Sequence, residues 1–108
     1  ADWFEPDLVI VSAGFDPHPN DLAMNVSYGG FELMTSIVTD IAERHCDGRI
    51  VFALEGGYNH ESLSRGVHSV LRVLTGLVDP VDPPIPGMPE VQAAAEFHKT
   101  AFADDDQD

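Results

Sequence analysis

Two short runs of apolar residues, each followed by small residues and then a polar one, divide the first part of the chain. The first run predicts a strand over residues 8–12, and it stops at Gly14. The second predicts a strand over residues 49–54, and it stops at Gly56. Neither run alternates with polar positions, which is typical of parallel-sheet strands buried on both faces.

Helical periodicity follows each predicted strand. Residues 27–45 carry apolar side chains at three- and four-residue intervals, with Ser27 as the expected N-cap and Asp47–Gly48 as the expected end. A second helix is expected over about residues 60–76. The residues expected to be buried are Phe31, Met34, Ile37, Val38 and Ile41 in the first helix and Leu63, Val67, Val70, Leu71 and Leu74 in the second.

The order strand, loop, helix, strand, loop, helix indicates an α/β fold. A right-handed crossover between two parallel strands is the strongly favoured connection. Both loops then open on the same edge of one sheet, where α/β folds place their ligands.

The remainder of the chain divides into two further segments. Residues 1–76 form the α/β unit, and the proline-rich residues 77–89 predict a stiff connector. Residues 90–108 predict a last helix, over 90–103 and docked on the same domain, and an acidic tail. Because the sequence lacks an initial Met and enters a strand almost at once, we expect a fragment of a longer protein.

The charge of the chain limits its partners. It has 19 acidic and 5 Lys or Arg residues, a net charge of -14. Such a surface repels nucleic acid and anionic membranes, tolerates or attracts cationic partners, and is also compatible with simple solubility or adaptation to high salt. The sequence shows no apolar run long enough for a bilayer and no visible signal peptide.

The single cysteine, Cys46, excludes an internal disulfide and predicts a reducing, intracellular location, which is the cytoplasm or, in a eukaryote, the nucleus. Its neighbour His45 does not make it a zinc site, because two adjacent residues lack the ligand number and spacing that zinc requires. We expect Cys46 to be structural.

Polar residues follow both predicted strands and could share one site. Asp16 is an oxygen ligand, an acid–base group, or a turn residue whose side chain bonds nearby backbone N–H groups. Tyr58 is a donor to a developing oxyanion or a residue that caps the core. His18 is a ligand or an exposed loop residue, and we expect the second. The polar residues expected in this neighbourhood are Asp16, His18, Asp21, Glu55, Tyr58, Asn59 and His60.

Two motifs, one after each predicted strand, resemble those of a known protein family. Ser12-Ala13-Gly14-Phe15-Asp16 followed by Asp21, and then Leu54-Glu55-Gly56-Gly57-Tyr58-Asn59, resemble the carboxyl-terminal part of the zinc-dependent histone deacetylase family. That family includes deacetylase-like amidohydrolases and acetylpolyamine amidohydrolases. The resemblance implies part of an arginase/deacetylase-like three-layer sandwich with a parallel sheet, of which this chain would supply two strands and their helices.

The resemblance also implies roles for single residues. Asp16 matches a ligand of the catalytic zinc, and Tyr58 matches the tyrosine that stabilises the oxyanion. Gly56 and Gly57 match the loop that lines the substrate channel, and Asp21 matches a recurrent loop carboxylate of structural character. The implied reaction is hydrolysis of an N-acetyl amide, in an acetylated lysine peptide or polyamine, by a metal-activated water.

Departures from the family pattern leave an alternative open. No histidine precedes His18, so the family's Asp-x-His ligand pair and its tandem-histidine base are missing, and the chain alone is expected to be inactive. Residues 22–24 replace the Pro-Leu-Gly of many relatives, which leaves the substrate preference open. The alternative is a stand-alone acidic α/β module that binds a basic partner without a metal. The oligomeric state is not predicted.

Overall fold

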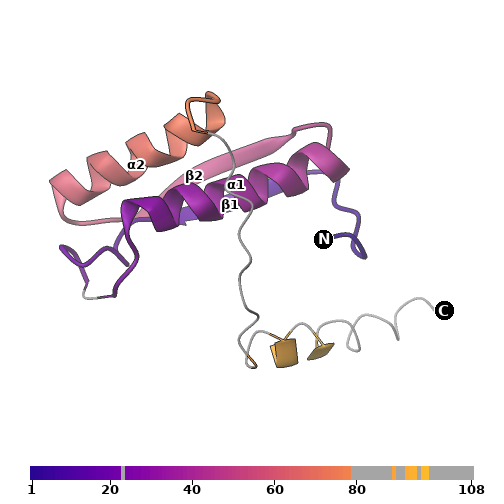
Figure 1. Cartoon of the computed structure of the whole chain (residues 1–108), viewed down its shortest axis with the longest axis horizontal. Helices are drawn as coiled ribbons and strands as arrows, with labels where there is room; N and C mark the ends of the chain where they lie inside the picture. Colours follow the sequence, from indigo (N-terminus) through magenta and orange to yellow (C-terminus); the bar gives the residue numbers. More distant parts are fainter. Residues whose placement is uncertain (23, 79–88, 90–91, 95, 98–108) are drawn as a thin grey trace.

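The computed structural model describes residues 1–22, 24–78, 89, 92–94 and 96–97. Its elements are β1 (Val9–Gly14), α1 (Tyr28–His45), β2 (Ile50–Gly56) and α2 (His60–Leu74) (Figure 1). The predicted α/β fold class is confirmed. Residues 92–94 and 96–97 of the expected last helix are helical, whereas residues 79–88 of the connector, the rest of that helix and the acidic tail lie outside the described residues.

The two strands pair in parallel over their whole length. Val9 lies opposite Ile50, and the register continues to Ala13 opposite Leu54 before it shifts at Gly14, which lies opposite Gly56. Parallel pairing places the carboxyl ends of both strands at one edge, as expected (at the left of Figure 1). Both strands run about two residues further than predicted, because the pairing continues to Gly14 opposite Gly56.

Local signals in the sequence set the ends of α1. The Ser27 hydroxyl accepts a hydrogen bond from the Gly30 N–H at 3.1 Å, and this satisfies one of the free donors of the first turn. At the other end Gly48 has a φ of 75°, and its N–H donates to the Ala42 carbonyl at 3.0 Å. Both predicted helix ends are therefore confirmed.

The predicted apolar stripes agree with the structure only in part: Phe31 and Val70 are buried, and Leu63 and Val67 pack partly buried against the core. α1 and α2 pack against each other, and the residues they bury are mostly small. Met34 and Ile37 instead line an open apolar groove of about 460 Å³ beside β1, and Leu71 and Leu74 are exposed. Small side chains let the two helices approach each other closely. A sequence pattern based on large apolar residues does not predict this kind of contact. The buried residues are Phe31, Thr35, Ser36 and Ala42 in α1 and Ser62, Gly66, Ser69, Val70 and Val73 in α2.

The core joins both helices to one face of the sheet. Phe15, Phe31 and Val70 form its centre, and Ala13 and Phe52 pack against them from the strands. The Phe15 and Phe31 rings meet edge to face, with their centroids 5.1 Å apart.

The opposite face of the sheet is apolar and exposed. Ile10 and Val51, which are register partners, expose 68% and 51% of their surface. The prediction that the strands are buried on both faces is therefore wrong for this chain, because no described residue covers the second face. Among the described residues there is also no helix with the length and apolar character that crossing a membrane requires.

Candidate functional site

Asp16 lies directly beyond the end of β1, and its carboxylate rests over two glycines. A Cβ atom placed on Gly56 would come 2.8 Å from Asp16 Oδ1, and one placed on Gly14 would come 2.9 Å from the same atom. Real Cβ atoms do not approach so closely, so glycine at both strand ends creates the space that the carboxylate occupies. The Phe15 N–H, which donates to the Gly56 carbonyl at 2.9 Å, holds the two strand ends together at this point.

The loop after β1 is fixed by its own backbone. The Asp21 N–H donates to the His18 carbonyl at 2.9 Å, and the Leu22 N–H donates to the Asp16 carbonyl at 3.0 Å. The half-buried Asp16 side chain, however, finds no hydrogen-bond donor among the described residues. A turn aspartate would use its carboxylate to accept from nearby N–H groups. The carboxylate of Asp16 is thus left available for a ligand.

His18 does not form a shared site with Asp16, and the expectation that His18 is exposed is wrong. Only 7% of its surface is accessible, because its ring stacks on Tyr28 with centroids 4.3 Å apart. The Arg65 guanidinium lies 4.4 Å from the centroid of the same Tyr28 ring. His18 Nδ1 accepts a hydrogen bond from the Asn20 N–H at 3.2 Å. The residue therefore stiffens the loop rather than facing a ligand.

The loop after β2 is short and depends on glycine. Gly57 has a φ of 131°, and a Cβ there would come 2.9 Å from Leu63 Cδ1. Tyr58 follows with 71% of its surface exposed, so the reading in which it caps the core is wrong. Asn59 caps α2, because its Oδ1 accepts from the Ser62 N–H at 3.0 Å.

A carboxylate from the first loop connects the two loops. Asp21 Oδ2 accepts hydrogen bonds from the Tyr58 N–H and the Asn59 N–H, each at 2.7 Å. The sequence predicts Asp21, Tyr58 and Asn59 in one neighbourhood, and these contacts confirm it, but nothing in the sequence indicates which atoms meet. The Asp21 carboxylate therefore holds the backbone of the second loop against the first loop.

The described residues do not assemble a complete metal site at this edge. No group of three His, Cys, Asp or Glu side chains within the described part of the chain could hold a metal ion. Glu55 and His60 are exposed and do not gather around Asp16. Asp16 is one candidate ligand, and any others would have to come from outside these residues.

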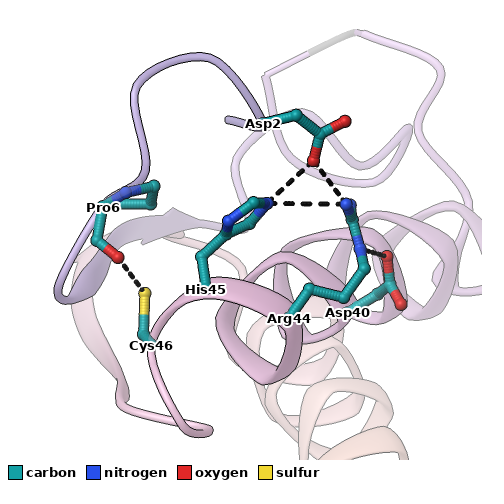
Figure 2. Close-up of polar contacts among 6 residues, drawn as sticks. All are labelled: Asp2, Pro6, Asp40, Arg44, His45 and Cys46. Atoms are coloured by element: carbon teal, nitrogen blue, oxygen red, sulfur yellow. Dashed lines mark hydrogen bonds and ion pairs between the residues drawn. The ribbon is translucent and has the colours of Figure 1, made fainter.

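A second polar cluster lies at the opposite end of the sheet, where α1 ends (Figure 2). The Asp2 carboxylate accepts from His45 Nε2 at 2.8 Å and from the Arg44 guanidinium, which also donates to Asp40 at 2.8 Å. The hydrogen bond from His45, followed by that from Arg44, holds the pKa of Asp2 below its usual value of 3.8.

Cys46 lies beside this cluster and has a structural environment. Its buried thiol donates to the Pro6 carbonyl, with the sulfur 2.9 Å from the oxygen (Figure 2). Together with the Asp2 cluster, this contact joins the first residues of the chain to the end of α1. It agrees with the expectation that Cys46 is structural.

The comparisons with known proteins agree with the motifs. The sequence pattern of the family described as the histone deacetylase domain matches residues 1–74. Histone deacetylase 10, chloroplastic, of Oryza sativa subsp. japonica is 41% identical over 78 residues, which cover 70% of this chain and 18% of that protein. Histone deacetylase 14, chloroplastic, of Arabidopsis thaliana is 35% identical over 108 residues, covering 98% of this chain and 22% of that protein.

A solved structure supports the same relationship. The structure of the histone deacetylase Clr3 matches with a TM-score of 0.67 and 31% identity, covering 90% of this chain and 16% of that chain. The two parallel strands and their helices therefore belong to an arginase/deacetylase fold. The chain spans about a fifth of the length of the curated relatives it matches.

Proposed function

This chain belongs to the histone deacetylase family, and on that premise we propose that the protein containing it is a zinc-dependent amidohydrolase that deacetylates an N-acetylated amine. One observation carries the proposal. At a single edge of the sheet lie a carboxylate without a hydrogen-bond donor among the described residues, that of Asp16, and an exposed phenol, that of Tyr58.

Asp16 is proposed as one ligand of the zinc. Carboxylate oxygens bind zinc, and a catalytic zinc has three protein ligands and one open position. When bound, the zinc would polarise the amide carbonyl of the substrate and lower the pKa of a bound water. The remaining ligands and the general base would lie outside these residues, so the 108-residue chain is expected to be inactive alone.

Tyr58 is proposed to donate a hydrogen bond from its phenol to the carbonyl oxygen of the substrate while negative charge develops on that oxygen. A donor of this kind lowers the barrier by on the order of 3 kcal/mol. The exposed position of Tyr58 supports the role, because the phenol has to reach a substrate that approaches from the edge of the sheet.

Gly56 and Gly57 are proposed to line the channel through which the acetylated chain enters. Two consecutive positions without side chains leave room for a substrate close to the backbone. The substrate is proposed to be an acetylated lysine peptide or an acetylated polyamine. Both are compatible with the net charge of -14, which favours cationic partners over nucleic acid.

The test compares two variants of the complete protein that contains this chain. Zinc content and the deacetylation rates of an acetyl-lysine peptide and an acetylated polyamine are measured together. Asp16→Ala should lose zinc and activity, whereas Tyr58→Phe should keep zinc and lose roughly 100- to 1,000-fold in kcat. If both variants retain full activity, the assignment of the site is wrong. The ratio of the two rates identifies the substrate class.

The alternative function is a stand-alone acidic module that binds a basic partner, and the net charge of -14 supports it. The exposed apolar pair Ile10 and Val51 argues against it, since a self-sufficient module would cover that face. A cooperative thermal transition of the isolated chain, with binding of a basic peptide in the absence of metal, would favour the alternative.

A further inference from the structure

Asp21 is the residue that connects the two loops of the site, and its contacts suggest a role in catalysis. We infer that Asp21 is a positioning residue: its carboxylate fixes the backbone of Tyr58 so that the phenol meets the substrate carbonyl. The inference rests on the proposed function, and it adds a residue that neither touches the substrate nor binds the metal.

The geometry of the contact is the first argument. A single oxygen, Asp21 Oδ2, accepts from two consecutive backbone N–H groups, and both donor–acceptor distances are 2.7 Å. Hydrogen bonds to an ionised acceptor are shorter and roughly twice as strong as neutral ones. Two such bonds constrain both peptide groups that flank Tyr58, the one that joins it to Gly57 and the one that joins it to Asn59.

The second argument is that the rest of the loop supports Tyr58 poorly. Two glycines precede it, and glycine permits a wide range of backbone conformations. Its side chain is 71% exposed and so gains little from packing. Within the described residues, the fixed points on either side are the Gly56 carbonyl, which accepts from Phe15, and the Asn59 cap of α2.

Asp21 is itself held in place, which is the third argument. It is half-buried, and its N–H donates to the carbonyl of His18. The His18 ring is buried against Tyr28, a residue of α1. A chain of contacts therefore connects the first helix to the Tyr58 peptide through a single carboxylate.

The expected effect is on geometry rather than on stability. Both hydrogen bonds lie at an exposed site, so water can replace the carboxylate when it is removed. A displacement of about 1 Å at a reacting group can nevertheless lower a rate by about 100-fold. The inference thus predicts a catalytic defect in a protein that still folds and still binds zinc.

The experiment uses the complete protein with Asp21→Ala, Asp21→Asn and a matched control, Asp47→Asn. Asp47 is an exposed carboxylate beyond the end of α1, and its side chain lies 3.8 Å from Arg49. Asp21→Ala should lower kcat roughly 10- to 100-fold, with KM and zinc content near those of the control. Asp21→Asn keeps an acceptor oxygen without the charge and should give an intermediate kcat.

Hydrogen exchange supplies a readout that does not depend on turnover. The amides of Tyr58 and Asn59 should exchange faster in Asp21→Ala than in Asp47→Asn, while those of β1 stay unchanged. If kcat and the exchange of these two amides match the control, the inference is overturned.

A double variant separates this inference from the proposed function. Adding Asp21→Ala to Tyr58→Phe should lower kcat little further, because both changes remove the same contribution. A full additional loss would overturn the inference, since Asp21 would then act independently of Tyr58. If Tyr58→Phe alone leaves kcat unchanged, the proposed role of Tyr58 fails, and the inference fails with it.

Discussion

The two loops at the carboxyl edge of the sheet hold their functional residues in different ways. The loop after β1 is bound by its own backbone hydrogen bonds, and Asp16 rests over the two glycines at the strand ends. The loop after β2 is shorter, and the backbone of Tyr58 is held by the side chain of Asp21 from the other loop. Asp16 is therefore placed by the paired ends of β1 and β2, whereas the backbone of Tyr58 is held by one side chain from the other loop.

This difference matches the two proposed tasks. A metal ligand has to keep one geometry, because zinc coordination tolerates little variation in ligand distance. A donor to a developing oxyanion only has to reach its position when the substrate is bound. Changes close to Asp16 should consequently affect zinc binding, and changes close to Tyr58 should affect the rate alone.

Among the substitutions that leave Asp16, Asp21 and Tyr58 unchanged, the largest effect is expected from Gly56→Ala. The new methyl carbon would come 2.8 Å from Asp16 Oδ1, so the carboxylate has to move away from its place over the strand ends. We expect the complete protein to lose zinc affinity by 10-fold or more, together with a roughly 100-fold loss of kcat. Zinc titration and deacetylation assays check this result.

The control for Gly56→Ala is Gly29→Ala in the first turn of α1. There the added carbon has its nearest neighbour at 3.8 Å, which is an ordinary contact. If Gly56→Ala and Gly29→Ala bind zinc equally well, Asp16 does not depend on the glycine at the end of β2.

The second largest effect is expected from Gly57→Ala, which acts on the other loop. The φ of 131° is unfavourable for alanine, and the added carbon would contact Leu63 Cδ1 at 2.9 Å. The strain should displace Tyr58 and lower kcat by roughly 10- to 100-fold, while zinc content stays normal. Loss of zinc in this variant would contradict the separation between the two loops.

The sequence predicted the positions of these residues better than it predicted how they are held. The apolar runs, Ser27 and Gly48 are local signals, so the strands and the ends of α1 follow from them directly. The predicted parallel strands placed Asp21 in the neighbourhood of Tyr58, but nothing near either residue indicates that the Asp21 carboxylate accepts from the Tyr58 backbone. It depends on the parallel pairing of β1 and β2, which becomes specific only when the fold has formed.

The burial of His18 and of the small helix residues was missed for a similar reason. A histidine between two prolines is typical of an exposed loop, yet the ring stacks on Tyr28 from the next helix. Apolar periodicity predicts that Met34 is buried, but the buried residue is its neighbour Thr35. The Thr35 hydroxyl donates a hydrogen bond to the Phe31 carbonyl at 2.7 Å. A polar group that bonds its own helix can be buried at little cost.

A smaller effect, on stability, is expected from Gly66→Ala in α2. A Cβ at this position would overlap the buried ring of Phe15, which begins the loop after β1. Overpacking of this kind costs about 1–3 kcal/mol in the free energy of unfolding. Urea denaturation of the complete protein checks the result, with Gly29→Ala as the control. An unchanged unfolding midpoint would show that the Phe15 ring moves aside freely and does not anchor the loop.

The smallest effect is expected from Asp2→Asn, at the end of the sheet that carries no proposed site residue. The folded-state pKa of Asp2 lies below its usual 3.8, so the ionised carboxylate stabilises the folded state above that pH. This contribution is lost as the pH falls through the lowered folded-state pKa. Asp2→Asn should therefore unfold at slightly lower urea concentration than the unmodified protein at pH 7, and the difference should shrink as the pH falls below 3.8 and through the lowered folded-state pKa.

The effect of Asp2→Asn should be small, because the carboxylate is exposed and screened by salt. Its deacetylation rate should equal that of the unmodified protein, since Asp2 contacts the end of α1 and neither loop of the site. The same denaturation series with Asp47→Asn, whose ion pair is longer at 3.8 Å, provides the matched control. A difference in midpoint that persists unchanged at low pH would mean that Asp2 stabilises the protein through packing rather than through its charge. A lower rate would mean that the two ends of the sheet are coupled, and the comparison between the loops would then have to include the first residues of the chain.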